Sequence, residues 1–113
     1  MGKIEITKKV LGICATNCYT VVDTETKEAL IIDPADRADV LIRDWKDKGV
    51  TPTTVLLTHG HFDHIGALAG VKMEYPDIKV YAAAKEKEVM ESPALNLSSS
   101  FGAAFTAQAD IYL

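Results

Sequence analysis

Thr58-His59-Gly60-His61-Phe62-Asp63-His64-Ile65-Gly66 is the stretch that decides the fold and the chemistry of this chain. It holds all three histidines of the 113-residue sequence, and four potential metal ligands fall within six residues: His59, His61, Asp63 and His64. On extended backbone His59 and His61 point the same way, whereas adjacent Asp63 and His64 require a turn. Gly60 makes a tight bend possible at low cost. Since imidazole and carboxylate suit zinc, iron or manganese, the stretch predicts two neighbouring ions, or one ion with supporting polar groups.

Structural interpretations of the same residues stay open beside this one. A histidine-rich loop can bind metal adventitiously, and Asp63 can cap a helix that begins at Ile65. Capping and ligation are compatible, so the first does not exclude the second. The stretch follows the apolar segment Val55–Thr58, which reads as a buried strand, and this context favours a functional loop.

The segments before this loop are predicted to be mostly strands. Ile4–Leu11 alternates apolar and polar residues, and Cys14–Val22 is rich in β-branched and aromatic residues. Ala29–Ile32 is a continuous apolar run, which predicts a strand buried on both faces and joined to Cys14–Val22 in a hairpin.

A helix is expected between that hairpin and the loop. Asp36 can cap it, and its apolar stripe contains Trp45, which we expect in the core. The helix is expected to run to about Lys48, and Gly49 to follow its last turn. Residues 51–53 then form a connector to the strand Val55–Thr58, and ligands commonly gather at the carboxyl ends of such strands.

The segments after the loop continue the alternation of helix and strand. A helix is predicted from Ile65 to Tyr75, because Pro76 disfavours helix in the residue before it. Ile78–Tyr81 follows as a strand and Ala84–Glu91 as a short charged helix with a solvated face. The sequence therefore predicts a mixed α/β sheet. Residues 92–113 show no clear period, and their Ser98–Ser100 run is interpreted as a loop.

Composition narrows the function classes. The net charge of −4 provides no basic patch, which disfavours nucleic acid as a partner. No apolar run has the length of a membrane span, and no secretory signal precedes the first strand. Cys14 and Cys18 have neither the spacing of a redox motif nor that of a zinc ribbon, so we expect free, buried thiols and a cytoplasmic protein.

The Thr58–Gly66 stretch resembles the signature loop of the metallo-β-lactamase superfamily, and most closely that of its glyoxalase II-like (hydroxyacylglutathione hydrolase-like) metallohydrolases. Asn17 and Tyr19 resemble the N-x-Y pattern of that family, Asp33 its first aspartate, and residues 93–98 its linker to a second half. The resemblance implies a four-layer αβ/βα sandwich of two similar halves. Residues 1–113 would be the N-terminal half as a single incomplete domain, with 92–113 an irregular tail leading to the second.

The resemblance also implies the ligand set. His59 and His61 would hold a first metal, and Asp63 and His64 a second, with zinc expected and iron or manganese possible. Asp63 would in addition orient the attacking water as a catalytic residue. Three further residues would support the ligands by hydrogen bonds: Asp33, Asn17 and Thr58. For Asp33 the alternative is an aspartate that starts a turn before Pro34.

The implied function is hydrolysis of a thioester such as a hydroxyacyl-glutathione at a binuclear centre. Lactone or phosphodiester hydrolysis, an iron-dependent sulfur dioxygenase, and a non-catalytic metal-binding half-domain are the alternatives. Each ion would find two protein ligands in this chain, whereas catalytic zinc usually has three, so we expect little activity from the chain alone. The chain is either a fragment or a half-domain that self-associates. A fragment and a half-domain would each expose an apolar face of the sheet. Because such a face seeks a partner, we expect a homodimer or higher oligomer.

Overall fold

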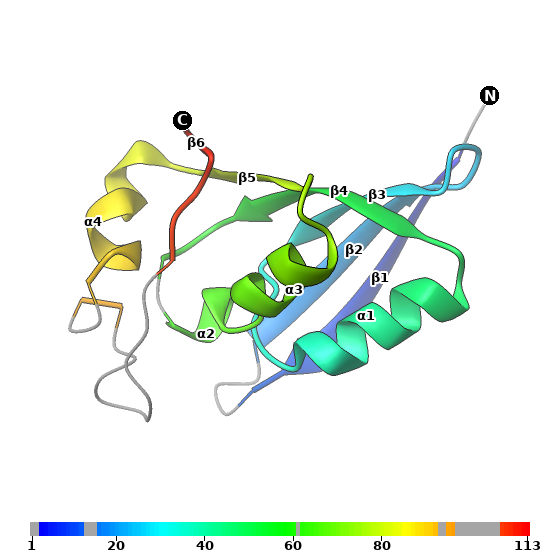
Figure 1. The fold of residues 1–113 in the computed structure, drawn as a ribbon, viewed down its shortest axis with the longest axis horizontal. Coiled ribbons are helices and arrows are strands. Elements are labelled where there is room, and N and C mark those ends of the chain that lie inside the picture. Colours follow the sequence, from blue (N-terminus) through cyan, green and yellow to red (C-terminus); the bar gives the residue numbers. More distant parts are fainter. Residues whose placement is uncertain (1–2, 13–15, 61, 93–94, 97–106) are drawn as a thin grey trace.

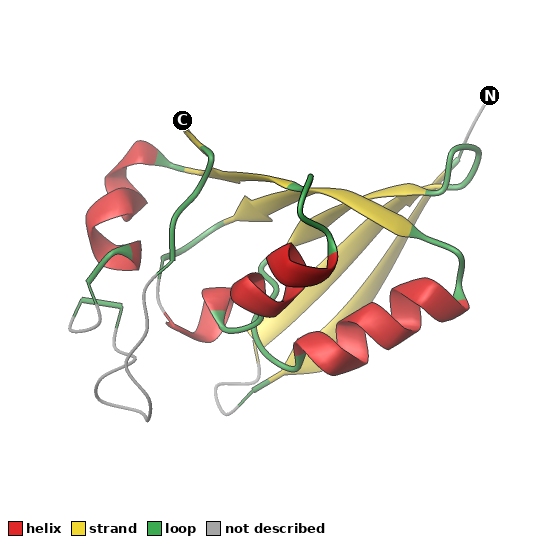
Figure 2. Cartoon of the chain, viewed as in Figure 1, coloured by secondary structure: helices red, strands yellow, loops and turns green. Residues whose placement is uncertain are grey.

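The computed structural model describes residues 3–12, 16–60, 62–92, 95–96 and 107–113, without the side chains of Phe62 and Asp63. The described residues form one six-stranded sheet in the order β1-β2-β3-β4-β5-β6 (Figure 1). Its strands are β1 (Ile4–Leu11), β2 (Thr16–Asp23), β3 (Glu28–Ile32), β4 (Thr51–Leu57), β5 (Lys79–Ala82) and β6 (Ile111–Tyr112). The helices are α1 (Ala38–Asp47), α2 (Phe62–Ile65), α3 (Leu68–Glu74), the short 3-10 helix η1 (Ala84–Glu86) and α4 (Lys87–Met90) (Figure 2).

Strand direction changes across the sheet. β1, β2 and β3 pair antiparallel, and β3, β4, β5 and β6 pair parallel. The predicted hairpin and the mixed α/β sheet are therefore confirmed. Helices α1, α2 and α3 lie on one face of the sheet (Figure 1). Parallel strands need crossover connections, and right-handed crossovers between strands added in one direction, β3 to β4 to β5, lie on the same face.

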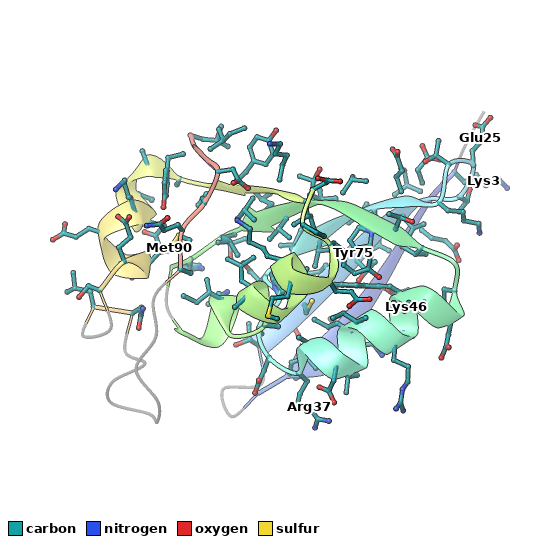
Figure 3. The ribbon with its side chains drawn as sticks, in the orientation of Figure 1. Lys3, Glu25, Arg37, Lys46, Tyr75 and Met90 are labelled. Carbon is teal, nitrogen blue, oxygen red and sulfur yellow. The ribbon has the colours of Figure 1, made fainter. Side chains whose placement is uncertain are left out.

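The hydrophobic core lies between this face and the helices. Alternate strand residues point into it, as the period of two requires, and Trp45 is only 1% exposed. The Trp45 indole N–H donates to Thr20 Oγ1 at 3.2 Å, and its ring meets Tyr75 edge-on at 6.0 Å. Lys46 lies near Tyr75 (Figure 3) and forms an ion pair with Glu74, which joins α1 to α3. The predicted core position of Trp45 is confirmed.

For α1, the prediction of its first residue's cap is wrong and the prediction of its end is confirmed. Asp36 does not cap the helix: Arg37 occupies the N-cap position in a left-handed conformation, and Asp36 Oδ1 instead accepts the Arg37 N–H at 2.8 Å. Gly49 follows the last turn with φ +68°, as expected. The Val50 N–H returns to the Trp45 carbonyl at 2.8 Å, the bond that ends a helix at such a glycine.

Three other boundaries differ from the sequence predictions. β4 begins at Thr51, so the expected connector is part of the strand. The helix expected from Ile65 to Tyr75 instead begins at Phe62 and is interrupted after Ile65, where the Ala67 N–H donates to the Pro34 carbonyl at 2.9 Å between α2 and α3. β3 is fully buried on one face only, since Leu30 and Ile32 are half-buried.

The end of the chain is more ordered than expected. The tail was predicted to be irregular, but its last residues form β6, which pairs with β5. The Leu113 N–H donates to the Ala82 carbonyl at 2.7 Å, and the Ala84 N–H donates to the Leu113 carbonyl at 2.6 Å. The Ser98–Ser100 run lies outside the described residues. None of the helices in the described part is long and apolar enough to cross a membrane.

The opposite side of the sheet, here called the open face, has no helix over it in the described chain (Figure 1). On β1 it exposes Ile4 (64%) and Ile6 (65%). The strand register places further apolar residues in line with them: Tyr19, Val21, Leu30, Ile32, Leu56 and Tyr81. An apolar sheet face of this kind is typical of a surface that packs against another layer.

The Cys18 thiol is buried in the core. Cys18 is 1% exposed, and burial raises the pKa of its thiol to about 12; the backbone hydrogen bond of Ala35 and the charge of Lys9 oppose this rise, and Asp33 adds to it. Because the thiolate is the nucleophile, we predict that iodoacetamide leaves Cys18 unmodified in the folded chain near neutral pH. Peptide mass mapping checks this, with the denatured chain as control. Modification at equal rates in both states would contradict it. Cys14, also expected to be buried, lies outside the described residues.

Candidate metal centre

The loop singled out by the sequence lies at the carboxyl end of β4, between the ends of its parallel neighbours β3 and β5. Ligand sites commonly form at this edge of α/β sheets. Thr58 and His59 are exposed, whereas Gly60 is buried, and α2 begins at Phe62. The strand before the loop and the helix after it therefore fix both of its ends.

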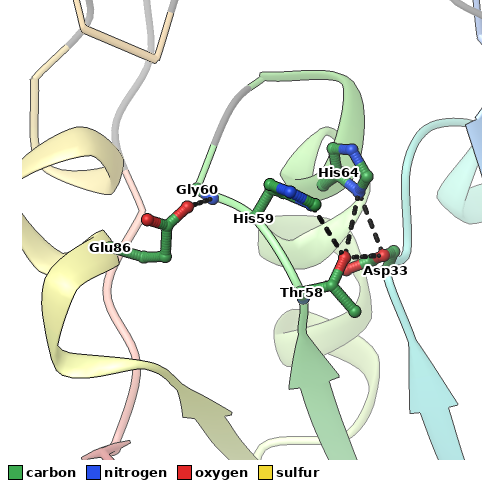
Figure 4. Close-up of polar contacts among 6 residues, drawn as sticks. All are labelled: Asp33, Thr58, His59, Gly60, His64 and Glu86. Carbon is green, nitrogen blue, oxygen red and sulfur yellow. Dashed lines mark hydrogen bonds and ion pairs between the residues drawn. The ribbon is translucent and has the colours of Figure 1, made fainter.

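Asp33 joins the loop to the end of β3. Its Oδ1 accepts the Thr58 N–H at 2.8 Å, and its Oδ2 accepts the Thr58 hydroxyl at 2.5 Å (Figure 4). The same Oδ2 lies 3.0 Å from Nδ1 of His64. Asp33 is 4% exposed and has φ +54°, a backbone conformation that aspartate tolerates better than most residues. The structure thus brings the expected supporting residues Asp33 and Thr58 together with His64.

The two described histidines lie side by side. The ring centroids of His59 and His64 are 4.7 Å apart, and Thr58 Oγ1 lies 3.1 Å from Nδ1 of His59 (Figure 4). Both Nδ1 atoms thus face polar groups of the strand ends. A ring held through one nitrogen is oriented to present the other, which is how supporting groups position histidine ligands.

The remaining candidate ligands are only partly described. His61 and the Asp63 side chain lie outside the described residues. The Asp63 backbone is inside α2, so the alternative that Asp63 caps a helix beginning at Ile65 is wrong. Within the described part of the chain, no three His, Cys, Asp or Glu side chains gather as a metal-binding group.

A pocket of about 400 Å³ adjoins His64, on the open face. Asn17, the third expected supporting residue, is exposed on β2 and lines this pocket rather than the loop itself. Its other lining residues are Thr16, Tyr19, Ile32, Asp33, Thr58 and His64. The volume lies in the range of small-molecule sites.

Glu86 contributes to the site although its sequence context did not indicate it. The run from Ala84 to Glu91 was interpreted as a solvated face, but the Gly60 N–H donates to Glu86 Oε1 at 2.9 Å (Figure 4). Gly60 also has no positive φ, so the expected tight bend is not the reason for glycine here. Close packing is the reason, since an added Cβ would meet Met90.

The described residues suit a metal ion of the zinc or iron type. Two imidazoles at one strand end are the nitrogen donors such ions prefer. A carboxylate holds one ring in place, as in many metal sites, and a glycine between the candidate ligands lets the neighbouring helix approach closely. His59 and His64, with His61 and Asp63 from outside the described part, are the residues that would hold the metal.

Comparisons with known proteins agree on one family. The sequence model of the metallo-beta-lactamase superfamily matches residues 11–111. Among solved structures, BLEG-1 B3 metallo-beta-lactamase superposes with a TM-score of 0.88 at 41% identity, over 96% of this chain and 53% of that one. TTHA1623 in a di-iron-bound form superposes with a TM-score of 0.77 at 29% identity, over 95% and 53%. These matches confirm the predicted half of the sandwich fold.

Curated relatives give the same result. "Probable metallo-hydrolase YqgX" from Bacillus subtilis is 38% identical over 86 residues, covering 76% of this chain and 39% of the relative. The hydroxyacylglutathione hydrolase of Haemophilus ducreyi is 40% identical over 57 residues, covering 50% and 24%. The matches therefore cover less than half the length of these relatives and about half that of the solved structures.

Removal of the Asp33 carboxylate should destabilise the fold. Asp33→Ala leaves the Thr58 N–H without its acceptor, which we expect to cost about 1–3 kcal/mol in the free energy of unfolding. Asp33→Asn keeps one acceptor oxygen and should cost less. Urea unfolding followed by Trp45 fluorescence measures both, with Asp47→Ala at an exposed position as control. Equal stabilities of Asp33→Ala and the control would contradict this role.

Proposed function

Because the chain belongs to the metallo-beta-lactamase superfamily, we propose that it provides the metal-binding loop of a hydrolase that cleaves a thioester of the hydroxyacyl-glutathione class. The observation that carries this proposal is the His59–His64 pair, held at the end of β4 by Thr58 and Asp33. The similarity to hydroxyacylglutathione hydrolases supports the thioester substrate.

The proposed ligand set follows the order of the loop. His59 and His61 would hold one ion, and Asp63 and His64 would hold a second. Zinc is the expected metal, and the di-iron form of a relative makes iron the main alternative. The chemistry that two such ions supply is polarisation of the scissile carbonyl and a lowered pKa of water.

The chain's own residues orient the reactants. Asp33 holds His64 through Nδ1 and so fixes the ring plane, while the Thr58 hydroxyl faces His59. Asp63 accepts a hydrogen bond from the attacking water and orients it toward the carbonyl carbon. The pocket beside His64, lined at that end by Asn17 and Thr58, would receive the acyl group.

A second candidate is hydrolysis of a β-lactam amide. It is favoured by the superposition on BLEG-1 B3 metallo-beta-lactamase. The same loop would serve, and only the pocket would select the substrate. A panel of thioester, lactone, phosphodiester and β-lactam substrates separates the candidates. The cytoplasmic location expected from the cysteines is part of the proposal, because Cys18 is a free thiol.

Metal binding is the first test of this function. We expect the 113-residue chain to bind zinc in calorimetry, and His59→Ala and His64→Ala each to weaken that binding, since each removes one imidazole. No binding by the unaltered chain would contradict the proposal.

Turnover is the second arm of that test. It is assayed on protein that contains the remaining ligands, whether they follow in the same polypeptide or come from a second copy. Asp63→Asn should lower thioester turnover on the order of 10²-fold, the effect of losing a group that acts in the transition state. Asp77→Asn, at an exposed turn, is the matched control. Unchanged turnover in Asp63→Asn would exclude its role.

We also propose that a second copy of the chain covers the open face. The face surrounds its apolar residues with acidic side chains, Asp23 and Glu28, and basic ones, Lys8 and Lys79, by strand alternation. Two copies related by a two-fold axis can therefore pair opposite charges around an apolar centre.

Light scattering tests this association. The unaltered chain is expected to be a dimer, and Ile6→Asp a monomer, because Ile6 is 65% exposed on the open face. Met73→Asp is the control, since Met73 is 84% exposed on α3 on the other side of the sheet. A monomeric unaltered chain at high concentration would overturn the proposal. It would assign the face to a segment outside residues 1–113 or to another protein.

A further inference from the structure

Gly60 is the point at which the candidate metal loop contacts the segment η1–α4. Its N–H donates to Glu86 Oε1 at 2.9 Å (Figure 4). Gly60 is buried although its neighbour His59 is exposed. Gly60, which separates the expected ligands His59 and His61 in the sequence, is thus held by a residue outside the loop.

Space around Gly60 is closed by backbone as well as side chain. A Cβ added at this position would lie 2.7 Å from Cγ of Met90, 3.0 Å from the Glu86 carbonyl oxygen and 3.2 Å from the Met90 nitrogen. Met90 is fully buried, so it has little room to move. The loop backbone therefore rests directly against η1 and α4, at a distance that only glycine permits.

Residues near the end of the chain hold that segment in turn. The Met90 carbonyl accepts the Asn96 side-chain amide at 3.3 Å and the Ala107 N–H at 2.9 Å. Asn96 is fully buried. At the other end of η1, Ala84 is bonded to the carbonyl of Leu113 beyond β6. The segment that carries Glu86 is consequently fixed at both ends.

We propose that Glu86 is a positioning residue for the metal loop. By accepting the Gly60 N–H, it fixes the backbone that follows His59 and so sets the direction of the His59 imidazole. The inference rests on the proposed metal-binding function. It adds a residue, Glu86, that would touch neither metal nor substrate and would act through the loop backbone alone.

A general contribution to stability is the competing interpretation. It predicts that removing the carboxylate lowers the free energy of unfolding and leaves metal affinity unchanged in the folded protein. A positioning role predicts that metal affinity falls while the chain stays folded, because groups that orient metal ligands typically change affinity by 10–100-fold.

The experiment compares Glu86→Ala, Glu86→Gln and Glu88→Ala in the 113-residue chain. Zn²⁺ affinity is measured by competition with a chelator, and exchange of the Gly60 amide proton by NMR in metal-free protein. Glu86→Ala is expected to weaken Zn²⁺ binding at least about 10-fold and to speed exchange at Gly60. Glu86→Gln retains an acceptor oxygen and should restore most of both properties. Glu88 is exposed on α4 next to this segment, so Glu88→Ala is the matched control and should change neither.

Each outcome decides a separate point. Unchanged Zn²⁺ affinity and unchanged Gly60 exchange in Glu86→Ala would overturn the inference. Faster exchange at unchanged affinity would also overturn it, since the hydrogen bond would then be structural only. If the unaltered chain fails to bind Zn²⁺, the proposed function fails, and the exchange rates still decide whether Glu86 holds the loop. If Glu86→Ala does not fold, Glu86→Leu, which keeps the bulk of the side chain and removes the acceptor, takes its place against Glu88→Ala, and the same outcomes apply.

Discussion

The Asp33 carboxylate is the interaction on which the arrangement of this site depends. One buried side chain accepts both the N–H and the hydroxyl of Thr58 and lies within 3.0 Å of His64. It thereby joins three separate elements: the end of β3, the end of β4 and helix α2. A buried carboxylate is stable only when its oxygens have partners, so the same bonds that orient the histidine also permit the burial. The same contacts of Asp33 therefore stabilise the fold and determine the geometry of the site.

The neighbouring strands of the sheet also hold the site in place. β4 lies between parallel β3 and β5, so the strand end that carries the loop is held on both sides. On one face the helices bury Trp45 and the aliphatic core. On the other, the pocket beside His64 adjoins the apolar open face. Whatever packs on that face must therefore also border the pocket, and the substrate site and the packing surface form a continuous surface.

Local signals made much of this predictable from sequence. The alternation in Ile4–Leu11, the apolar stripe around Trp45 and the glycine after α1 each depend on near neighbours in the chain. Long-range hydrogen bonds produced the differences: the Ala67 N–H bonds to Pro34 and divides a helix that its sequence would continue. Glu86 belongs to the same class, because a run of alternating Lys and Glu gives no sign that one carboxylate turns inward to Gly60. The loop residues were identified from their chemistry, whereas the groups that hold them became visible only in three dimensions.

The contact between Gly60 and the segment η1–α4 also has a consequence for the order of events during synthesis. The loop leaves the ribosome well before Ala107 and Leu113, whose hydrogen bonds fix the segment against which it rests. Chains emerge amino-terminus first, so the nascent loop carries its histidines before their final support exists. The hydrogen bonds that fix the loop through this segment are therefore complete only after β6 has joined the sheet. A metal site at this loop would accordingly be assembled late in folding and not when its histidines first emerge.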